Sequence, residues 1–143
     1  MANIETRTAM TERSVFRIAS LTKQFTAAAL IKLAAAGRVE LNSPVARYLP
    51  FMERVQTTSL LELMHHTAGL HSDESGVSTH PGAAPNQVAL AEEIARQSQP
   101  FDFPPGTAWL YSTANYIMLG AVIEAVTSAP FSQVMSELVC APL

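Results

Sequence analysis

The sequence lacks several features that would indicate particular classes of protein. Its one cysteine, Cys140, excludes an internal disulfide, and we expect a small buried hydrophobic residue there because no helix start or cation adjoins it. Lysine and arginine are scattered, and the net charge is −3, so the charge pattern gives no reason to expect nucleic-acid binding. The longest apolar run, Ile117–Ile123, is far shorter than the roughly 20 residues of a membrane-spanning helix.

The N-terminus, MANIETRTAM, has no apolar stretch like that of a signal peptide, which predicts a cytoplasmic chain if this end is the native one. The length of 143 residues suits a single domain. The content of 48% hydrophobic and 15% charged residues is richer in apolar side chains than is usual for a solvated domain of this size. This excess indicates a body larger than these residues alone.

The residue pattern predicts a mainly helical chain. Propensity, caps and apolar spacing predict helices over 20–36, 44–48, 60–66, 88–99 and 112–127, with a short strand at 14–17 and a loop over 71–87. Gly37 and Gly69 are expected to end the first and third of these helices. The helix over 20–36 is apolar nearly all round, which predicts burial on most sides that the remaining chain is too short to provide completely. No further element is predicted near the C-terminus.

The segment FRIASLTKQF, residues 16–25, places Ser20 and Lys23 three positions apart at the start of a predicted helix. Residues at this spacing are surface neighbours, about 5–6 Å apart at Cβ. Serine needs a base to act as a nucleophile, and a lysine can be that base if burial disfavours its ammonium form. The alternative is that Ser20 caps the helix and Lys23 points to water. A lysine in the first turn is electrostatically misplaced, which favours the first interpretation.

Four blocks of this sequence resemble, in the same order, the penicillin-recognising serine hydrolases, which include class C β-lactamases, D-alanyl-D-alanine carboxypeptidases and related esterases. The blocks are FRIASLTKQFTAAAL (16–30), GRVELNSPVARYLP (37–50), LLELMHHTAGL (60–70) and FPPGTAWLYSTANYIMLGAVIE (103–124). The resemblance implies that residues 1–143 are a partial β-lactamase-like domain. They would comprise the active-site helix and the helical region of this α/β serine hydrolase fold, without most of its sheet.

The resemblance also implies roles for individual residues. Ser20 matches the acylated nucleophile, Lys23 its proton-abstracting partner and Tyr111 the tyrosine of the second motif, which shuttles protons to the leaving group. Without the resemblance, Tyr111 reads as an amphipathic aromatic at a helix entrance. The implied substrate is a small-molecule or peptide acyl donor, namely a β-lactam, a D-alanyl peptide or an ester. No cofactor is implied, because the serine itself carries the acyl group.

Two departures from the family pattern bear on activity. The second motif usually reads tyrosine, any residue, asparagine, whereas this chain has Tyr111-Ser112-Thr113, so Thr113 keeps a hydroxyl but lacks the amide that would donate to a substrate carbonyl. The third motif, on a strand, is not within these residues, so we expect a truncated member. The alternative is a catalytically incomplete helical scaffold or ligand-binding fragment. A homo-oligomer that covers exposed apolar helices is a further possibility.

Other polar groups carry weaker signals. The four histidines, His65, His66, His71 and His80, match no common zinc spacing, so we expect no metal site. The family resemblance implies a structural role for the segment that begins at His66. Trp109 is a candidate for the wall of a substrate cleft, with packing before the following helix as the alternative. The resemblance also implies that substrate specificity resides in the loop over 71–87, where relatives vary their substrate cleft.

Overall fold

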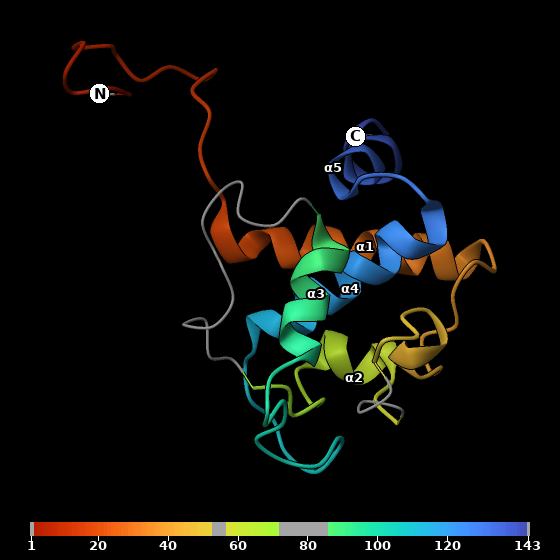
Figure 1. Ribbon diagram of the computed structural model, residues 1–143. Helices are drawn as coiled ribbons and strands as arrows, with labels where there is room; N and C mark the ends of the chain where they lie inside the picture. Colours follow the sequence, from red (N-terminus) through yellow and green to blue (C-terminus); the bar gives the residue numbers. More distant parts are fainter. Residues whose placement is uncertain (1, 53–56, 72–85, 143) are drawn as a thin grey trace.

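The computed structural model describes residues 2–52, 57–71 and 86–142. They form a helical body from which residues 2–18 extend away (Figure 1). The elements are η1 (Ala19–Leu21), α1 (Thr22–Ala35), η2 (Val45–Arg47), α2 (Leu60–His65), α3 (Gln87–Ala95), α4 (Thr113–Thr127), α5 (Phe131–Met135) and η4 (Ser136–Cys140). Within the described residues there are isolated bridges but no strand, so the predicted mainly helical class is confirmed and the predicted strand at 14–17 is wrong.

Helix α4 is the centre of the body and packs against α1, α2, α3 and α5 (Figure 1). The apolar residues of α4 point in several directions, so the helix buries them by packing against neighbours on several sides. The buried residues of α4 are Ala114, Asn115, Met118, Leu119, Gly120, Ala121, Val122 and Ile123. In the described part of the chain no single helix is long and apolar enough to cross a membrane; α4 joined to residues 131–140 reaches that length only as a pair bent by 86°.

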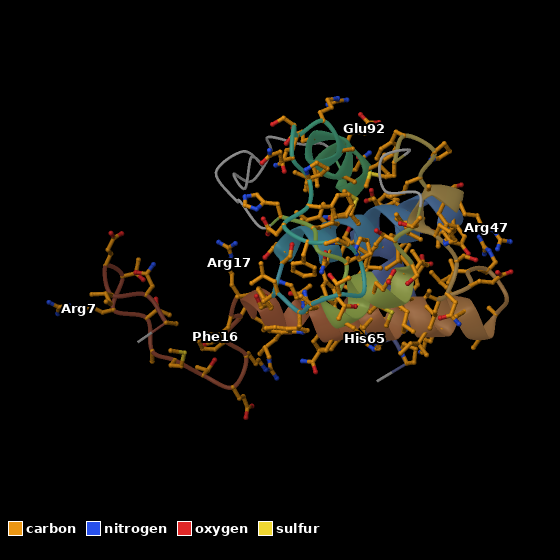
Figure 2. The ribbon with its side chains drawn as sticks, turned by 90° about the horizontal axis from the view of Figure 1, so that it is seen from below. Arg7, Phe16, Arg17, Arg47, His65 and Glu92 are labelled. Carbon is orange, nitrogen blue, oxygen red and sulfur yellow. The ribbon has the colours of Figure 1, made fainter. Side chains whose placement is uncertain are left out.

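Helix α1 buries one face and leaves the other open. Its buried residues are Thr26, Ala29, Leu30 and Leu33, whereas Ile31 is 53% exposed and Leu21, just before the helix, is 61% exposed. The predicted burial on most sides is therefore not reached within the described residues, as the shortness of the chain led us to expect. Most side chains of the extended N-terminal segment are also open to solvent, Phe16 among them at 64% exposed, and Figure 2 shows Arg7 far from the helices.

Some helix ends form as the sequence predicts, and two differ from the prediction. Ser59 and Glu62 form a capping box at the start of α2. Gly37 follows α1 with φ +69°, as predicted, but α2 ends at His66 in the left-handed region with φ +60° rather than at Gly69. Pro44 is the N-cap of η2, not its first helical residue.

The C-terminal part of the chain corrects two further predictions. Helix α5 and the turn η4 follow α4, where the sequence predicted no element. Pro130 is the N-cap of α5. Cys140, the last residue of η4, is exposed rather than buried.

A ladder of backbone hydrogen bonds holds residues 66–71 against residues 100–110. The pairs are His71 N–H to Pro100 O (2.8 Å), Asp102 N–H to Gly69 O (2.8 Å), Gly106 N–H to Thr67 O (2.8 Å) and Leu110 N–H to His66 O (3.0 Å). This ladder joins the end of α2 to the segment that enters α4. Tyr111 directly follows the last residue of the ladder, Leu110, and its hydroxyl reaches Ser20. The predicted specificity loop lies mostly outside the described residues.

Candidate active site

Ser20 lies in η1, the tight turn that precedes α1, and its side chain meets two partners. Its Oγ is 2.7 Å from the hydroxyl of Tyr111, and the Nζ of Lys23 donates to it at 3.3 Å. The turn has Ile18 at its N-cap, and α1 has Leu21 there, neither with a side-chain capping bond. The interpretation of Ser20 as a helix cap is therefore wrong.

The backbone around Ser20 is set in an uncommon conformation. Ala19 has φ +45°, a left-handed value that costs an ordinary residue about 1–2 kcal/mol. Strain of this kind persists where surrounding structure imposes it, and it is often found at functional sites. The following N–H, that of Ser20, belongs to the first turn of the helical segment and so has no acceptor within it. It is one candidate donor for an oxyanion that develops next to Ser20 Oγ.

Tyr111 reaches Ser20 from a point 91 residues along the chain. The pKa of Tyr111 is lowered from its ordinary value, first by hydrogen bonding with Lys23 and then by hydrogen bonding with Ser20. The Nζ of Lys23 also lies 4.8 Å from the centre of the Tyr111 ring. A cation at this position favours the phenolate, which makes the tyrosine a stronger candidate for a proton acceptor near neutral pH than an isolated phenol.

The sequence prediction missed a close participant, His66. Its ring centre is 4.7 Å from that of Tyr111, 5.3 Å from that of Tyr116 and 6.2 Å from that of Trp109. The pKa of His66 is lowered, chiefly by burial and then by the charge of Lys23. In the sequence it was one of two adjacent histidines, and no spacing rule pointed to partners more than forty residues away.

The site opens into a cleft of about 440 Å³. Its lining residues are Arg17, Ala19, Ser20, Thr22, Lys23, Thr26, Gln87, Thr113, Tyr116, Ile117 and Phe131. Thr113, the first residue of α4, is thus in the cleft as proposed for substrate contact. Trp109 is not among these residues; it is 64% exposed and stands with its ring edge toward His66. Among the described residues, the lining contains the cationic side chains of Arg17 and Lys23 and no carboxylate.

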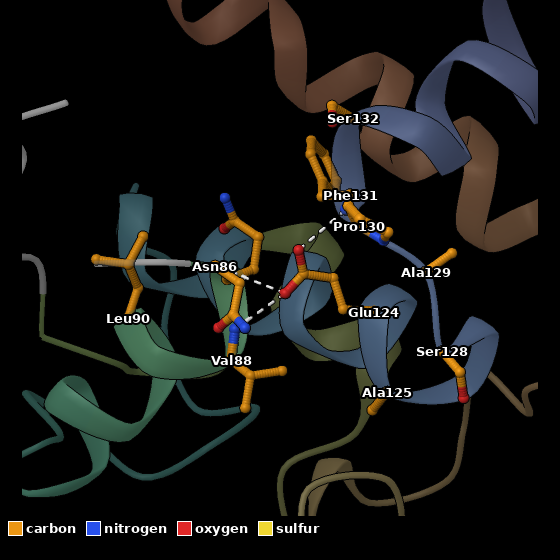
Figure 3. A pocket seen from close by; sticks show the side chains of 11 residues that line it. Asn86, Val88, Leu90, Glu124, Ala125, Ser128, Ala129, Pro130, Phe131 and Ser132 are labelled. Atoms are coloured by element: carbon orange, nitrogen blue, oxygen red, sulfur yellow. Dashed lines mark hydrogen bonds between the residues drawn. The ribbon is translucent and has the colours of Figure 1, made fainter. Parts of the chain in front are cut away.

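A second hollow, of about 630 Å³, lies between α3, α4 and the start of α5 (Figure 3). Glu124 stands in it, and its carboxylate accepts backbone N–H groups from Gln87 (2.8 Å), Val88 (3.2 Å) and Phe131 (3.0 Å). One acidic side chain of α4 therefore satisfies N–H groups at the beginning of two other helices, where such donors have no intrahelical acceptor. Ser20 does not line this hollow, but Gln87 and Phe131 line both it and the cleft beside Ser20.

The remaining histidines and acids do not form a metal centre in the described ranges, where no group of three or more possible ligands is found. His71 pairs with Asp102 at 2.6 Å, which adds a side-chain contact to the backbone ladder. His80 lies outside the described residues.

Comparison with known proteins shows the family to which this chain belongs. The family described as Beta-lactamase matches residues 1–143, so the chain belongs to the Beta-lactamase family. Esterase EstB of Burkholderia gladioli is 35% identical over all of this chain and 40% of its own length. The crystal structure of a D-stereospecific amidohydrolase from Streptomyces sp. has a TM-score of 0.76 and 29% identity, covering 89% of this chain and 42% of that one.

A third relative is the D-amino acid amidase of Ochrobactrum anthropi, whose structure has a TM-score of 0.81 and 26% identity over 99% of this chain and 40% of its own. The chain thus spans less than half the length of each of these relatives. The helical arrangement described above corresponds to a part of their fold.

Proposed function

We propose that the protein acts as a serine hydrolase through an acyl-enzyme on Ser20. The observation that carries this proposal is the meeting of Ser20 Oγ with Tyr111 OH at 2.7 Å and with Lys23 Nζ at 3.3 Å beside an open cleft. A nucleophile within hydrogen-bond reach of its base is the arrangement that activated serine requires. Membership of the Beta-lactamase family supports the same reading.

In the proposed reaction, Ser20 Oγ attacks the carbonyl carbon of the substrate while its proton passes to the phenolate of Tyr111. Lys23 lies beside both oxygens and stabilises the negative charge of the phenolate. The tetrahedral oxyanion collapses, the bond to the leaving group breaks, and the leaving group takes the proton from Tyr111. Water then repeats these steps: it gives its proton to Tyr111, attacks the acyl carbon and releases the acid, and Ser20 recovers a proton.

The proposed substrates are a β-lactam, a D-alanyl peptide, a small amide or an ester. The names of the relatives, an esterase, an amidohydrolase and an amidase, support an acyl donor of this size. Thr113 lines the cleft at the position of the second-motif residue, so we assign to its hydroxyl a contact with the substrate. A side chain with no amide donor at this position is expected to change the orientation of an amide-bearing substrate.

Covalent labelling tests the proposal. The protein is incubated with a fluorophosphonate and, separately, with a fluorescent penicillin, and intact mass is measured for the wild type, for Ser20→Ala and for Ser14→Ala. Ser14 lies on the extended N-terminal segment and serves as a matched control for loss of a hydroxyl. We expect one adduct on the wild type and on Ser14→Ala and none on Ser20→Ala. An unlabelled wild type, under conditions that label full-length EstB, would refute the proposal.

The other candidate function is ligand binding without turnover. It is favoured by Thr113, which replaces the amide of the usual second motif. Binding of a penicillin that persists in Ser20→Ala and leaves no covalent mass would support it. Self-association through the open apolar face of α1 remains a prediction, and sedimentation at several concentrations tests it.

A further inference from the structure

The side chain of His66 links the end of α2 to the residue that follows Tyr111. Its Nδ1 accepts the backbone N–H of Ser112 at 3.2 Å, and the side-chain amide nitrogen of Asn115 lies at the same distance. Its own carbonyl accepts the N–H of Leu110 at 3.0 Å. Both backbone neighbours of Tyr111 are therefore bonded to one residue, and the ring of that residue lies against the ring of Tyr111.

The protonation state of His66 follows from these donors. A backbone N–H can only donate, so Nδ1 must carry no proton, and the neutral ring holds its hydrogen on Nε2. Protonation would place a third N–H against the donors of Ser112 and Asn115 and would remove the Ser112 bond. It would also set a second positive charge close to Lys23.

We propose that His66 is a positioning residue whose neutral ring holds Tyr111 against Ser20 and Lys23, and whose protonation releases Tyr111. This inference rests on the proposed function for its effect on acylation, but the hold itself is a property of the structure. In the described part of the chain, the ionisable groups that face the ring are Lys23 from α1, Tyr111 from the segment before α4 and Tyr116 from α4. Among the described residues no carboxylate forms an ion pair with it. The lowered pKa of His66 agrees with a ring that is neutral at pH 7.

The conformation of the backbone gives a precise test variant. His66 has φ +60°, a region that asparagine tolerates better than other residues with a side chain. Asparagine places its Oδ1 as many bonds from the backbone as Nδ1 of histidine, and that oxygen can accept the Ser112 N–H without titrating. His66→Asn therefore keeps the bond and removes the switch, whereas His66→Leu removes both. His65→Asn is the matched control, because His65 is the preceding residue and is exposed.

The first measurement does not depend on activity. Long-range ¹H–¹⁵N correlation spectra of the wild type at neutral pH should show His66 with Nδ1 unprotonated, and on acidification the amide shift of Ser112 should follow the titration of His66. A ring with its proton on Nδ1, or a Ser112 amide that ignores the titration, would overturn the proposal. These outcomes hold whether or not the chain hydrolyses anything.

The second measurement is the rate of fluorophosphonate labelling of Ser20 as a function of pH. Below the pKa of His66, two protonations oppose reaction in the wild type and in His65→Asn, so log rate should fall with a slope near two. His66→Asn should fall with a slope near one, and His66→Leu should be about 10–100-fold slower than His66→Asn at every pH because Tyr111 is misplaced. Superimposable profiles for His65→Asn and His66→Asn would refute the inference. A wild type that is never labelled would instead refute the proposed hydrolase.

Discussion

The close approach of Gly69 to Phe103 allows a stability prediction with an internal control. A Cβ built on Gly69 would lie 2.1 Å from the carbonyl oxygen of Phe103, closer than such atoms come in folded proteins. Gly69 and Gly37 have similar left-handed φ values, +76° and +69°, but a Cβ on Gly37 meets nothing within 4 Å. Alanine at the two positions therefore shares the backbone penalty and differs only in the clash.

The magnitudes follow from these two terms. The left-handed conformation costs alanine about 1–2 kcal/mol, and the reduced freedom of the unfolded chain returns about 0.4–1 kcal/mol. Gly37→Ala should therefore lose roughly 1 kcal/mol of unfolding free energy. Gly69→Ala should lose about 2–3 kcal/mol more, at the upper end of overpacking costs, because the atom it meets belongs to the backbone and cannot rotate away.

Urea unfolding followed by circular dichroism measures both variants against the wild type. With a denaturant slope of about 2 kcal/mol/M, the midpoint of Gly69→Ala should lie about 1 M or more below that of Gly37→Ala. Equal midpoints would refute the reasoning, since they would mean that residues 66–71 and 100–110 can move apart without loss of unfolding free energy.

Two further perturbations address the charges. Lys23→Met should raise the pKa of Tyr111, because hydrogen bonding with Lys23 is the leading cause of its lowering. The absorbance of tyrosinate, taken as a difference from the same variant carrying Tyr111→Phe, measures the midpoint of the Tyr111 titration. A midpoint equal to that of the wild type would count against the assignment. Glu124→Gln should cost about 1–3 kcal/mol in urea unfolding, because charged acceptors of backbone N–H groups are replaced by an amide. The control Glu92→Gln, which breaks an exposed ion pair with Arg96, should cost less than about 1 kcal/mol; equal losses would contradict the role of Glu124.

Much of the helical plan was predictable because its signals are local. The run of helix formers ending at Gly37, and the apolar segment beginning after Ser112, specify α1 and α4 to within a residue or two. The end of α2 was not predictable in the same way, since Gly69 carries the usual stop signal and yet His66 takes the left-handed position. Gly69 is instead required by the backbone of Phe103, a contact that no local pattern announces.

In the candidate site, too, contacts between residues close in the sequence were predictable and contacts between distant residues were not. Ser20 and Lys23 are three residues apart, so helical geometry alone brings them together. Tyr111 is distant in sequence and could be placed only through a family resemblance. His66 escaped both routes, because its partners Ser112 and Asn115 lie on another element and its adjacent histidine made it look like part of an unspecific pair. Contacts of this kind depend on how α2 and α4 pack.

The carboxylate of Glu124 has a consequence for the shape of the cleft. Gln87 and Phe131 line the cleft beside Ser20, and the backbone N–H of each is held by that one carboxylate, which lies outside the cleft. Two sides of the opening thus share a common anchor behind them. We therefore expect a change at Glu124 to alter the spacing of Gln87 and Phe131 across the cleft, although the Glu124 carboxylate is not part of the cleft lining.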